Sequence, residues 1–124
     1  MRINDKYYLA DHGIRQAIYG NNRRDIELIL ENIVCLELLR RGYKVSLGRI
    51  RNKEVDFVCD KNGDRIYVQV CYFLASEKTI EREFGSYDDI RDNYPKYIVS
   101  MDEFDMSRNG IIHMNIRNFL LNDL

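Results

Sequence analysis

Residues 54–71 read EVDFVCDKNGDRIYVQVC, and this stretch decides the fold that we expect for the chain. Apolar and polar residues alternate on both sides of Asn62-Gly63, which is the pattern of half-buried strands. Asn-Gly is the preferred pair for a two-residue type I′ turn, because both central residues take a positive φ. The stretch therefore predicts a hairpin in which strands at 54–59 and 65–74 are joined by this turn.

The turn also predicts which residues of the two strands face each other. Counting outward from Asn-Gly places Asp56 opposite Gln69 and Glu54 opposite Cys71. Side chains alternate along a strand, so the residues divide into two faces. The face expected to cover a hydrophobic core carries Val55, Phe57, Cys59, Ile66, Val68 and Val70. The other face, with polar groups near its end, carries Glu54, Asp56, Tyr67, Gln69 and Cys71.

Signals for helices and further strands surround the hairpin. Asp25 can cap a long helix that runs to about Arg41, with Gly42 as its C-terminal αL residue. This helix is apolar nearly all round, so we expect it to be the central helix, covered on most faces. The other predicted elements are strands at 6–10, 43–50, 96–100 and 111–114, and helices at 12–19, 79–91 and 115–121. The order helix, three strands, helix, strand predicts an α/β domain with a mixed sheet.

Length and composition limit the class of protein. The 124 residues are 45% hydrophobic and 31% charged, with a net charge of -1, which predicts one globular domain over residues 1–124. No apolar run is long enough to cross a bilayer or to form a signal peptide, so we expect no membrane contact. Cys35, Cys59 and Cys71 lack zinc-ligand spacing and predict reduced thiols in the cytoplasm. The near-neutral charge disfavours a tight, sequence-independent nucleic-acid binder.

An aspartate and an amide side by side on paired strands are typical of a site for a hard cation. Mg²⁺ is bound in proteins by carboxylates, carbonyl oxygens and water. Glu31, on the predicted central helix, is a candidate for a third group, because a buried carboxylate needs a partner. The alternative is that Glu31 pairs with an arginine and that Asp56 ends in solvent.

Six short segments form an ordered set of motifs: LEN at 30–32, LELLRRGY at 36–43, EVDFV at 54–58, YVQVCY at 67–72, TIERE at 79–83 and DNYPKY at 92–97. Together they resemble the C-terminal domain of unknown function that follows an AAA+ ATPase module in many bacterial and archaeal proteins. The resemblance covers residues 6–121 and implies a restriction-endonuclease-like fold of the PD-(D/E)XK superfamily, whose core order matches the order predicted above. It also implies that the chain is the C-terminal part of a longer ATPase, whose AAA+ module would be its partner. The chain itself has no G-x-x-x-x-G-K-[ST] and so no P-loop for ATP.

The resemblance implies roles for particular residues. Glu31 matches the helix glutamate of the nuclease motif, Asp56 the strand aspartate, Gln69 the glutamate of E-x-K and Cys71 its lysine. Asp56, Gln69 Oε1 and the Val70 carbonyl would hold Mg²⁺ or Mn²⁺, with Glu31 acting through a water. A cysteine cannot replace the cation that helps to activate water, so we expect impaired phosphodiesterase activity. Taken alone, Cys71 is better explained as a small residue on the sheet surface than as a nucleophile.

The sequence thus predicts a nuclease-like accessory domain of an AAA+ ATPase, which is a metal-dependent phosphodiesterase if it is active. Arg49, Arg51 and Lys53 are candidates for DNA contact, although a solvated loop explains them equally well. Glu54 is a candidate third carboxylate, and Lys44 or Lys53 a candidate replacement for the missing cation. The alternative function is a protein-interaction or regulatory module with a vestigial active site. A homodimer is an open alternative for the assembly.

Overall fold

The computed structural model describes residues 23–50, 53–74, 77–88 and 90–122. The strand predicted at 6–10 and the helix predicted at 12–19 lie outside these residues. The helices are α2 (Arg23–Arg40), α3 (Glu77–Gly85) and α4 (Ile116–Leu121). The strands are β1 (Lys44–Ile50), β2 (Lys53–Lys61), β3 (Asp64–Val70), β4 (Lys96–Ser100) and β5 (Ile112–Asn115).

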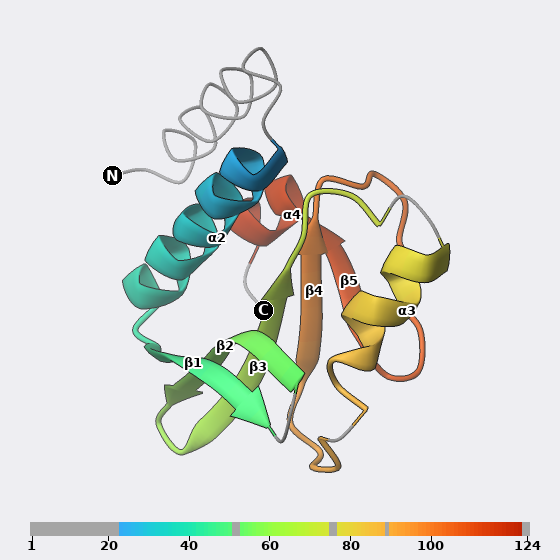
Figure 1. Ribbon diagram of the computed structural model, residues 1–124. Coiled ribbons are helices and arrows are strands. Elements are labelled where there is room, and N and C mark those ends of the chain that lie inside the picture. Colours follow the sequence, from blue (N-terminus) through green and yellow to red (C-terminus); the bar gives the residue numbers. More distant parts are fainter. Residues whose placement is uncertain (1–22, 51–52, 75–76, 89, 123–124) are drawn as a thin grey trace.

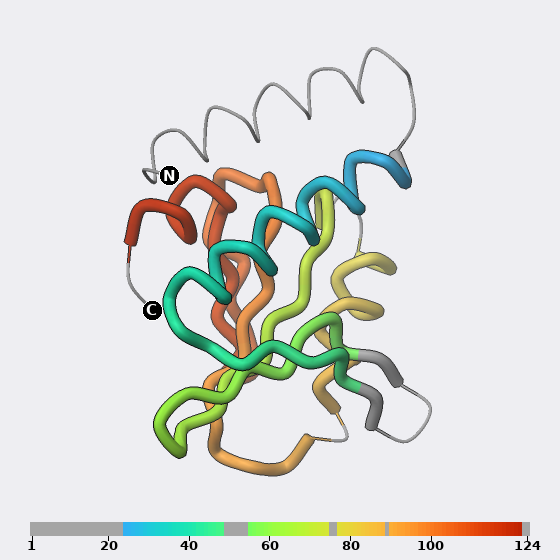
Figure 2. The backbone as a smooth tube through the Cα atoms, turned by 90° about the vertical axis from the view of Figure 1, so that its left-hand side faces the viewer, coloured from blue at the N-terminus to red at the C-terminus, as the bar shows by residue number. Residues whose placement is uncertain are grey.

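The five strands form one mixed sheet in the order β1-β2-β3-β4-β5. The pairs β1–β2 and β2–β3 are antiparallel, whereas β3–β4 and β4–β5 are parallel. Figure 1 shows α2 and α4 on one side of the sheet and α3 on the other, and Figure 2 looks onto the side on which α2 runs obliquely across the strands. This arrangement confirms the predicted α/β class with a mixed sheet.

The predicted hairpin turn is confirmed, and its register is confirmed as far as Phe57 opposite Val68, whereas the predicted pairs Asp56–Gln69 and Glu54–Cys71 lie beyond this ladder. Asn62 and Gly63 have φ values of 53° and 85°, as a type I′ turn requires. The pairing runs without a shift from Lys61 opposite Asp64 to Phe57 opposite Val68. The regular ladder between β2 and β3 ends at this last pair, immediately before Asp56 and Gln69.

One predicted face assignment is wrong, because β2 contains an irregularity. Between Ser46–Val58 and Gly48–Val55, the pairing of β1 with β2 shifts by one residue. This β-bulge turns Val55 away from Phe57 and into the apolar cluster on the other face of the sheet. A regular alternation had placed Val55 with Phe57.

Both faces of the sheet carry an apolar core. The first core lies under α2 and α4 and includes Leu30, Phe57, Val68 and Phe119. The second lies under α3 and includes Val55, Tyr67, Cys71, Phe84 and Ile98. The prediction of one apolar face and one face with polar groups near its end is therefore incomplete, since α3 covers the second face.

The C-terminus of α2 is formed as predicted. Gly42 has a φ of 94°, its N–H donates to Leu39 at 3.0 Å, and the N–H of Tyr43 donates to Leu38 at 3.1 Å. Ile26, Leu30, Val34 and Leu38 face the core, and all are buried. The expectation that α2 is covered on most faces is wrong for the described residues, because exposed leucines lie on its outer side.

The boundaries of the remaining elements differ modestly from the prediction. Helix α3 ends at Gly85, earlier than the predicted 91, because the next residues close tighter turns, such as Tyr87 N–H to the Phe84 carbonyl at 3.2 Å. The Tyr87 hydroxyl then donates to the Tyr97 carbonyl at 2.6 Å, which ties this turn to β4.

Asn115 caps α4 by accepting from the Arg117 N–H at 2.8 Å. No helix in the described part of the chain is both long and apolar enough to span a membrane.

Candidate functional site

Asp56 and Gln69 lie side by side, as the hairpin register predicts, and their side chains replace the missing strand ladder. The backbone N–H of Asp56 donates to Gln69 Oε1 at 2.9 Å. The backbone N–H of Val70 donates to Asp56 Oδ2 at 2.8 Å. Each side chain thus satisfies a backbone donor of the opposite strand at the point where β2 and β3 stop pairing.

The other end of Gln69 contacts helix α3. Gln69 Nε2 donates to Glu83 Oε2 at 2.8 Å, and both residues are buried, at 8% exposure each. Arg82 Nη2 lies 3.4 Å from the other carboxylate oxygen of Glu83. Gln69 therefore bridges β2 and α3, and both polar atoms of its amide are hydrogen-bonded.

Burial and neighbouring carboxylates raise the pKa values of Asp56 and Glu31. Burial raises the pKa of Asp56 to about 7, the Val70 N–H opposes this shift, and the nearby charges of Glu31, Glu83 and Glu27 add to it. Burial also raises the pKa of Glu31, and Glu27 and Glu83 raise it further. Glu31 is thus near enough to Asp56 to influence it electrostatically, as are Glu83 and Glu27.

The predicted ligands do not form a ready metal site. Gln69 Oε1 already accepts the Asp56 N–H, and Asp56 Oδ2 accepts the Val70 N–H. Among the described residues, no three acidic, histidine or cysteine side chains are placed to hold one metal ion together. One oxygen of Asp56 and the amide oxygen of Gln69 thus each already accept one backbone hydrogen bond, and we derive no metal-assisted step.

Cys71, at the position of the motif lysine, lies in apolar surroundings. Its side chain is 2% exposed within the second core, which also contains Val55 and Leu74. Its backbone N–H donates to the Val99 carbonyl at 3.0 Å and so continues the link from β3 to β4. The thiol is therefore buried in the mainly apolar cluster on the α3 side of the sheet.

The expected DNA contacts fall at the β1–β2 connection. Arg49 and Lys53 lie on the paired ends of these strands, where Arg49 is opposite Glu54 and Ile50 is opposite Lys53. Arg51 lies outside the described residues, as do the side chains of Arg49, Lys53 and Glu54. DNA contact by this connection stays a prediction.

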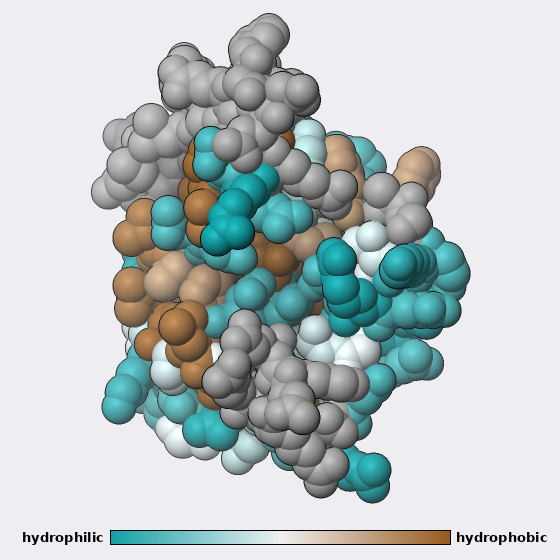
Figure 3. All heavy atoms as spheres, in the orientation of Figure 1, coloured by the Kyte–Doolittle hydropathy of each residue, from teal (hydrophilic) through white to brown (hydrophobic). Residues whose placement is uncertain are grey.

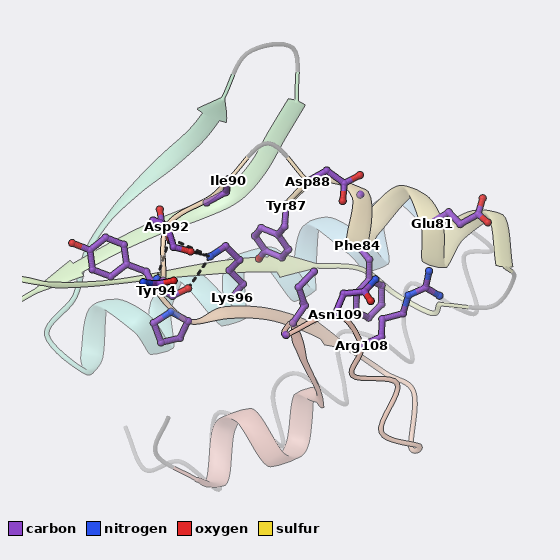
Figure 4. Close-up of a pocket in the computed structure, with 15 residues that line it drawn as sticks. Glu81, Phe84, Tyr87, Asp88, Ile90, Asp92, Tyr94, Lys96, Arg108 and Asn109 are labelled. Atoms are coloured by element: carbon purple, nitrogen blue, oxygen red, sulfur yellow. Dashed lines mark hydrogen bonds and ion pairs between the residues drawn. The ribbon is translucent and has the colours of Figure 1, made fainter.

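A cavity of about 710 Å³ lies on the α3 side of the sheet, and none of the predicted site residues lines it. Its walls come from α3 with Phe84, from the segment that leads into β4, and from the loop before β5 (Figure 4). Lys96 enters it from β4 but is held by the Asp92 carboxylate at 3.1 Å and the Tyr94 carbonyl at 3.0 Å. Arg108, the other cation that lines the cavity, lies 3.5 Å from the Glu77 carboxylate, so both cations face carboxylates of the protein.

A second buried polar cluster joins β4 and β5. The Ser100 hydroxyl donates to Asp102 Oδ2 at 2.8 Å and lies 2.7 Å from His113 Nε2. The Met106 N–H donates to His113 Nδ1 at 3.1 Å, so the neutral ring carries its proton on Nε2. The serine stands between the histidine and the aspartate and is 1% exposed, which is not the order or the access of a nucleophile. The cluster holds the loop between β4 and β5.

Glu83 and Glu27 are the members of the Asp56 surroundings that the sequence analysis missed. The buried residues of α3 are Ile80, Glu83 and Phe84, which share one face of the helix. Glu83 follows Ile80 by three positions, and this spacing was a usable signal that it faces the sheet. Glu27 lies one helical turn before Glu31 on α2. Its position follows from the same periodicity.

The comparisons with known proteins do not identify a family. None of the known protein-family models matches the chain. The sequence is similar to an uncharacterized protein of Haemophilus influenzae (strain KW20/Rd), with 34% identity over 122 residues. The match covers 98% of this chain and 30% of that protein. The chain therefore spans less than a third of the length of this relative.

Proposed function

We propose that this chain is a nuclease-like accessory domain that does not cleave DNA and whose acidic site has become structural. The bridging of β2 and α3 by Gln69 carries this proposal. A metal ligand must offer a lone pair toward the ion, and one of the two lone pairs of Gln69 Oε1 already accepts the Asp56 N–H. The Nε2 of the same amide donates to Glu83, which fixes the orientation of the side chain. The AAA+ ATPase module is the partner that the sequence resemblance suggests, and the greater length of the Haemophilus protein agrees with such a partner.

The surroundings of Cys71 support the same proposal. In a nuclease of this kind a cation stands near the reacting phosphate, and losing one preorganised charge partner costs about 10²–10³ in rate. Here a thiol lies in an apolar core instead. With Glu27, Glu31 and Glu83 around Asp56, the site carries negative charge that repels a phosphate rather than attracts it.

Metal binding and DNA cleavage by the whole chain test the proposal. Mn²⁺ is titrated calorimetrically into the wild type, Asp56→Ala and Asp64→Ala, and each protein is then incubated with supercoiled and branched DNA. Asp64 is an exposed aspartate at the hairpin turn and serves as the matched control. We expect no cleavage by any of the three proteins and no Mn²⁺ binding that depends on Asp56.

Cleavage that requires Mn²⁺, persists in Asp64→Ala and disappears in Asp56→Ala would overturn the proposal. That result would show that the Asp56 carboxylate binds a metal ion despite its hydrogen bond to the Val70 N–H. The domain would then be a metal-dependent phosphodiesterase.

A further inference from the structure

The loop that joins β4 to β5, residues 101–111, is fastened to the sheet through His113. This histidine lies on β5 and is 4% exposed. Its Nδ1 accepts the Met106 N–H at 3.1 Å, from the middle of the loop, and its backbone N–H donates to Ser107 Oγ at 2.8 Å. On the other side of the ring, Nε2 lies 2.7 Å from the Ser100 hydroxyl oxygen. One side chain thus connects the loop to the end of β4.

The Ser100 hydroxyl leaves a single role for Nε2 of His113. It donates its proton to Asp102 Oδ2 at 2.8 Å and accepts the Asp102 N–H at 3.1 Å. Because a hydroxyl has one proton and two lone pairs, its remaining lone pair accepts the proton on Nε2. The two ring nitrogens therefore have fixed and opposite roles, Nε2 as donor and Nδ1 as acceptor. A second proton, on Nδ1, would point at the Met106 N–H, donor against donor.

The charged groups that act on the ring come from the loop itself. Among the described residues these are Asp102 and Asp105, which raise the pKa of His113, whereas burial has the larger effect and lowers it. The Phe104 carbonyl also faces the ring and favours its protonation. Strand β4 faces it with two uncharged residues, the Ser100 hydroxyl and the paired Ile98. The closed loop therefore favours the neutral ring.

The same loop forms one wall of the cavity on the α3 side of the sheet. Residues 108–111 line the cavity from the loop, and the Arg108 guanidinium lies 5.4 Å from the centroid of the Phe84 ring (Figure 4). The ion pair of Arg108 with Glu77 is exposed, at 40% and 73%, and such pairs contribute little. Figure 3 shows hydrophilic surface over α3, so the buried Phe84 ring is covered by the loop rather than by α3. Release of the loop would uncover this ring.

We propose that His113 is a pH-sensitive switch that holds the 101–111 loop in place when neutral and releases it when protonated. With a second proton, taken from solvent, Nδ1 loses the lone pair that binds the Met106 N–H. The new Nδ1 proton can turn to the Phe104 carbonyl, whereas the Met106 N–H loses its partner. The loop then moves so that water can pair with this N–H. Acidification thereby raises the population of a form in which the cavity wall is open.

Amide hydrogen exchange of the full chain, followed by NMR, tests the switch. Exchange rates are divided by those of an unstructured peptide at the same pH, which gives the protection of the Met106 and His113 amides at pH 7.5 and pH 5.5. We expect the protection of both to fall about five- to tenfold at pH 5.5, one unit below the ordinary histidine pKa of 6.5. Val68, which is buried and paired with Phe57, is the internal control and should lose no protection.

Two variants separate the switch from a loop that opens for other reasons. In His113→Gln, the side chain can accept the Met106 N–H and donate to Ser100 without titrating, so the Met106 amide should be equally protected at both pH values. Asp105→Asn keeps the acceptor for the Ser107 N–H but removes a charge that favours the protonated ring within the closed loop. Acid should then reduce the protection of the Met106 amide more than in the wild type, with no change at pH 7.5.

The chemical shifts of the His113 ring nitrogens test the proposal in the wild type alone. We expect a ring that carries its proton on Nε2 at pH 7.5 and takes up the second proton only below pH 6.5. A proton on Nδ1 at pH 7.5, or a doubly protonated ring above pH 6.5, would contradict the proposal. Equal protection of the Met106 amide at both pH values in the wild type, or an equal fall in the wild type and His113→Gln, would overturn it as well.

Discussion

Asp56 illustrates how one residue can serve the backbone and still oppose folding. Its Oδ2 accepts the Val70 N–H, which would otherwise lack a partner where the ladder ends. Yet the same carboxylate is held among three glutamates, and its pKa is raised to about 7. A residue that is useful as a hydrogen-bond acceptor and costly as a charge is a natural target for substitution.

We predict that Asp56→Asn stabilises the protein at pH 8 by about 1–3 kcal/mol, since one pKa unit corresponds to about 1.4 kcal/mol. The folded pKa lies above the ordinary value of 3.8. The stability that the protonated group gives is therefore present below pH 3.8 and is lost as the pH rises through about 7. Asparagine keeps the acceptor and carries no charge. Urea unfolding at pH 4.5 and pH 8 measures the effect, which should shrink at the lower pH and be absent in Asp64→Asn.

Gln69→Glu should have the opposite effect and destabilise the protein by about 2–4 kcal/mol near neutral pH. The substitution removes the Nε2–H donor to Glu83 and sets two buried carboxylates against each other. Urea unfolding at pH 8 measures the loss. A variant as stable as the wild type would show that Gln69 does not bridge β2 and α3 in solution. Gln69→Glu with added Mn²⁺ gives a further check, because only a working metal site would restore the lost stability.

For single residues, the sequence predicted the contacts that depend only on residues near each other along the chain. The proximity of Asp56 and Gln69 followed from counting outward from the Asn-Gly turn. Their hydrogen bonds did not follow, because they depend on where the β2–β3 ladder stops. Glu83 was missed because its partner lies 14 residues away, on a different element.

Among the elements, β2 shows how a bulge redirects side chains. Gly48 faces Val55 across the irregularity, and a Cβ on Gly48 would lie 2.7 Å from Val58 Cγ2 and 3.0 Å from the Val55 carbonyl oxygen. The close approach of the two strands therefore requires glycine at this point. Through the bulge, this glycine determines that Val55 joins the core under α3.

Gly48→Ala should destabilise the protein by about 1–3 kcal/mol, because overpacking forces the two strands apart. Gly85→Ala is the matched control, since a Cβ there meets only Asp88 Oδ2 at an ordinary 3.5 Å. Gly85 lies at the end of α3, where alanine should leave stability unchanged or raise it slightly. Thermal unfolding of both variants separates the two cases. Equal effects would mean that the strands do not approach closely at Gly48.

The hairpin turn could be predicted from the sequence, whereas the β-bulge between β1 and β2 could not. Asn62-Gly63 specifies its turn through backbone preferences of two adjacent residues, so the sequence suffices. The shift between Ser46 and Gly48 depends on how β1 lies against β2, and no local pattern encodes it. The early end of α3 is similar, since the Tyr87 hydroxyl takes its partner from β4.

For the whole molecule, two buried groups set opposing trends of stability with pH. Burial lowers the pKa of His113, against the raising effect of Asp102 and Asp105. The folded protein therefore favours the neutral ring, and the stability it gives is present above pH 6.5 and is lost on acidification. Asp56 acts in the reverse direction over the range from pH 3.8 to about 7.

We expect the two trends to separate in single variants. In Asp56→Asn, the free energy of unfolding should rise with pH between 5 and 7, because the contribution of His113 remains. In His113→Gln, it should fall over the same range, because the contribution of Asp56 remains. Glutamine can accept from the Met106 N–H and donate to Ser100, as the neutral ring does. Chemical unfolding across this pH range measures both slopes. Parallel profiles in the two variants would contradict the assignment.

The order of the strands along the chain also has a consequence for how the protein is made. Helix α2 and strands β1, β2 and β3 follow one another directly and are neighbours in the sheet. Contacts between segments close in sequence form fastest, whereas β4 and β5 pair in parallel only after longer connections have closed. As the chain emerges from the ribosome, we expect α2 and strands β1, β2 and β3 to collapse into a helix-backed meander. This meander would then be the template on which α3, β4, β5 and α4 condense.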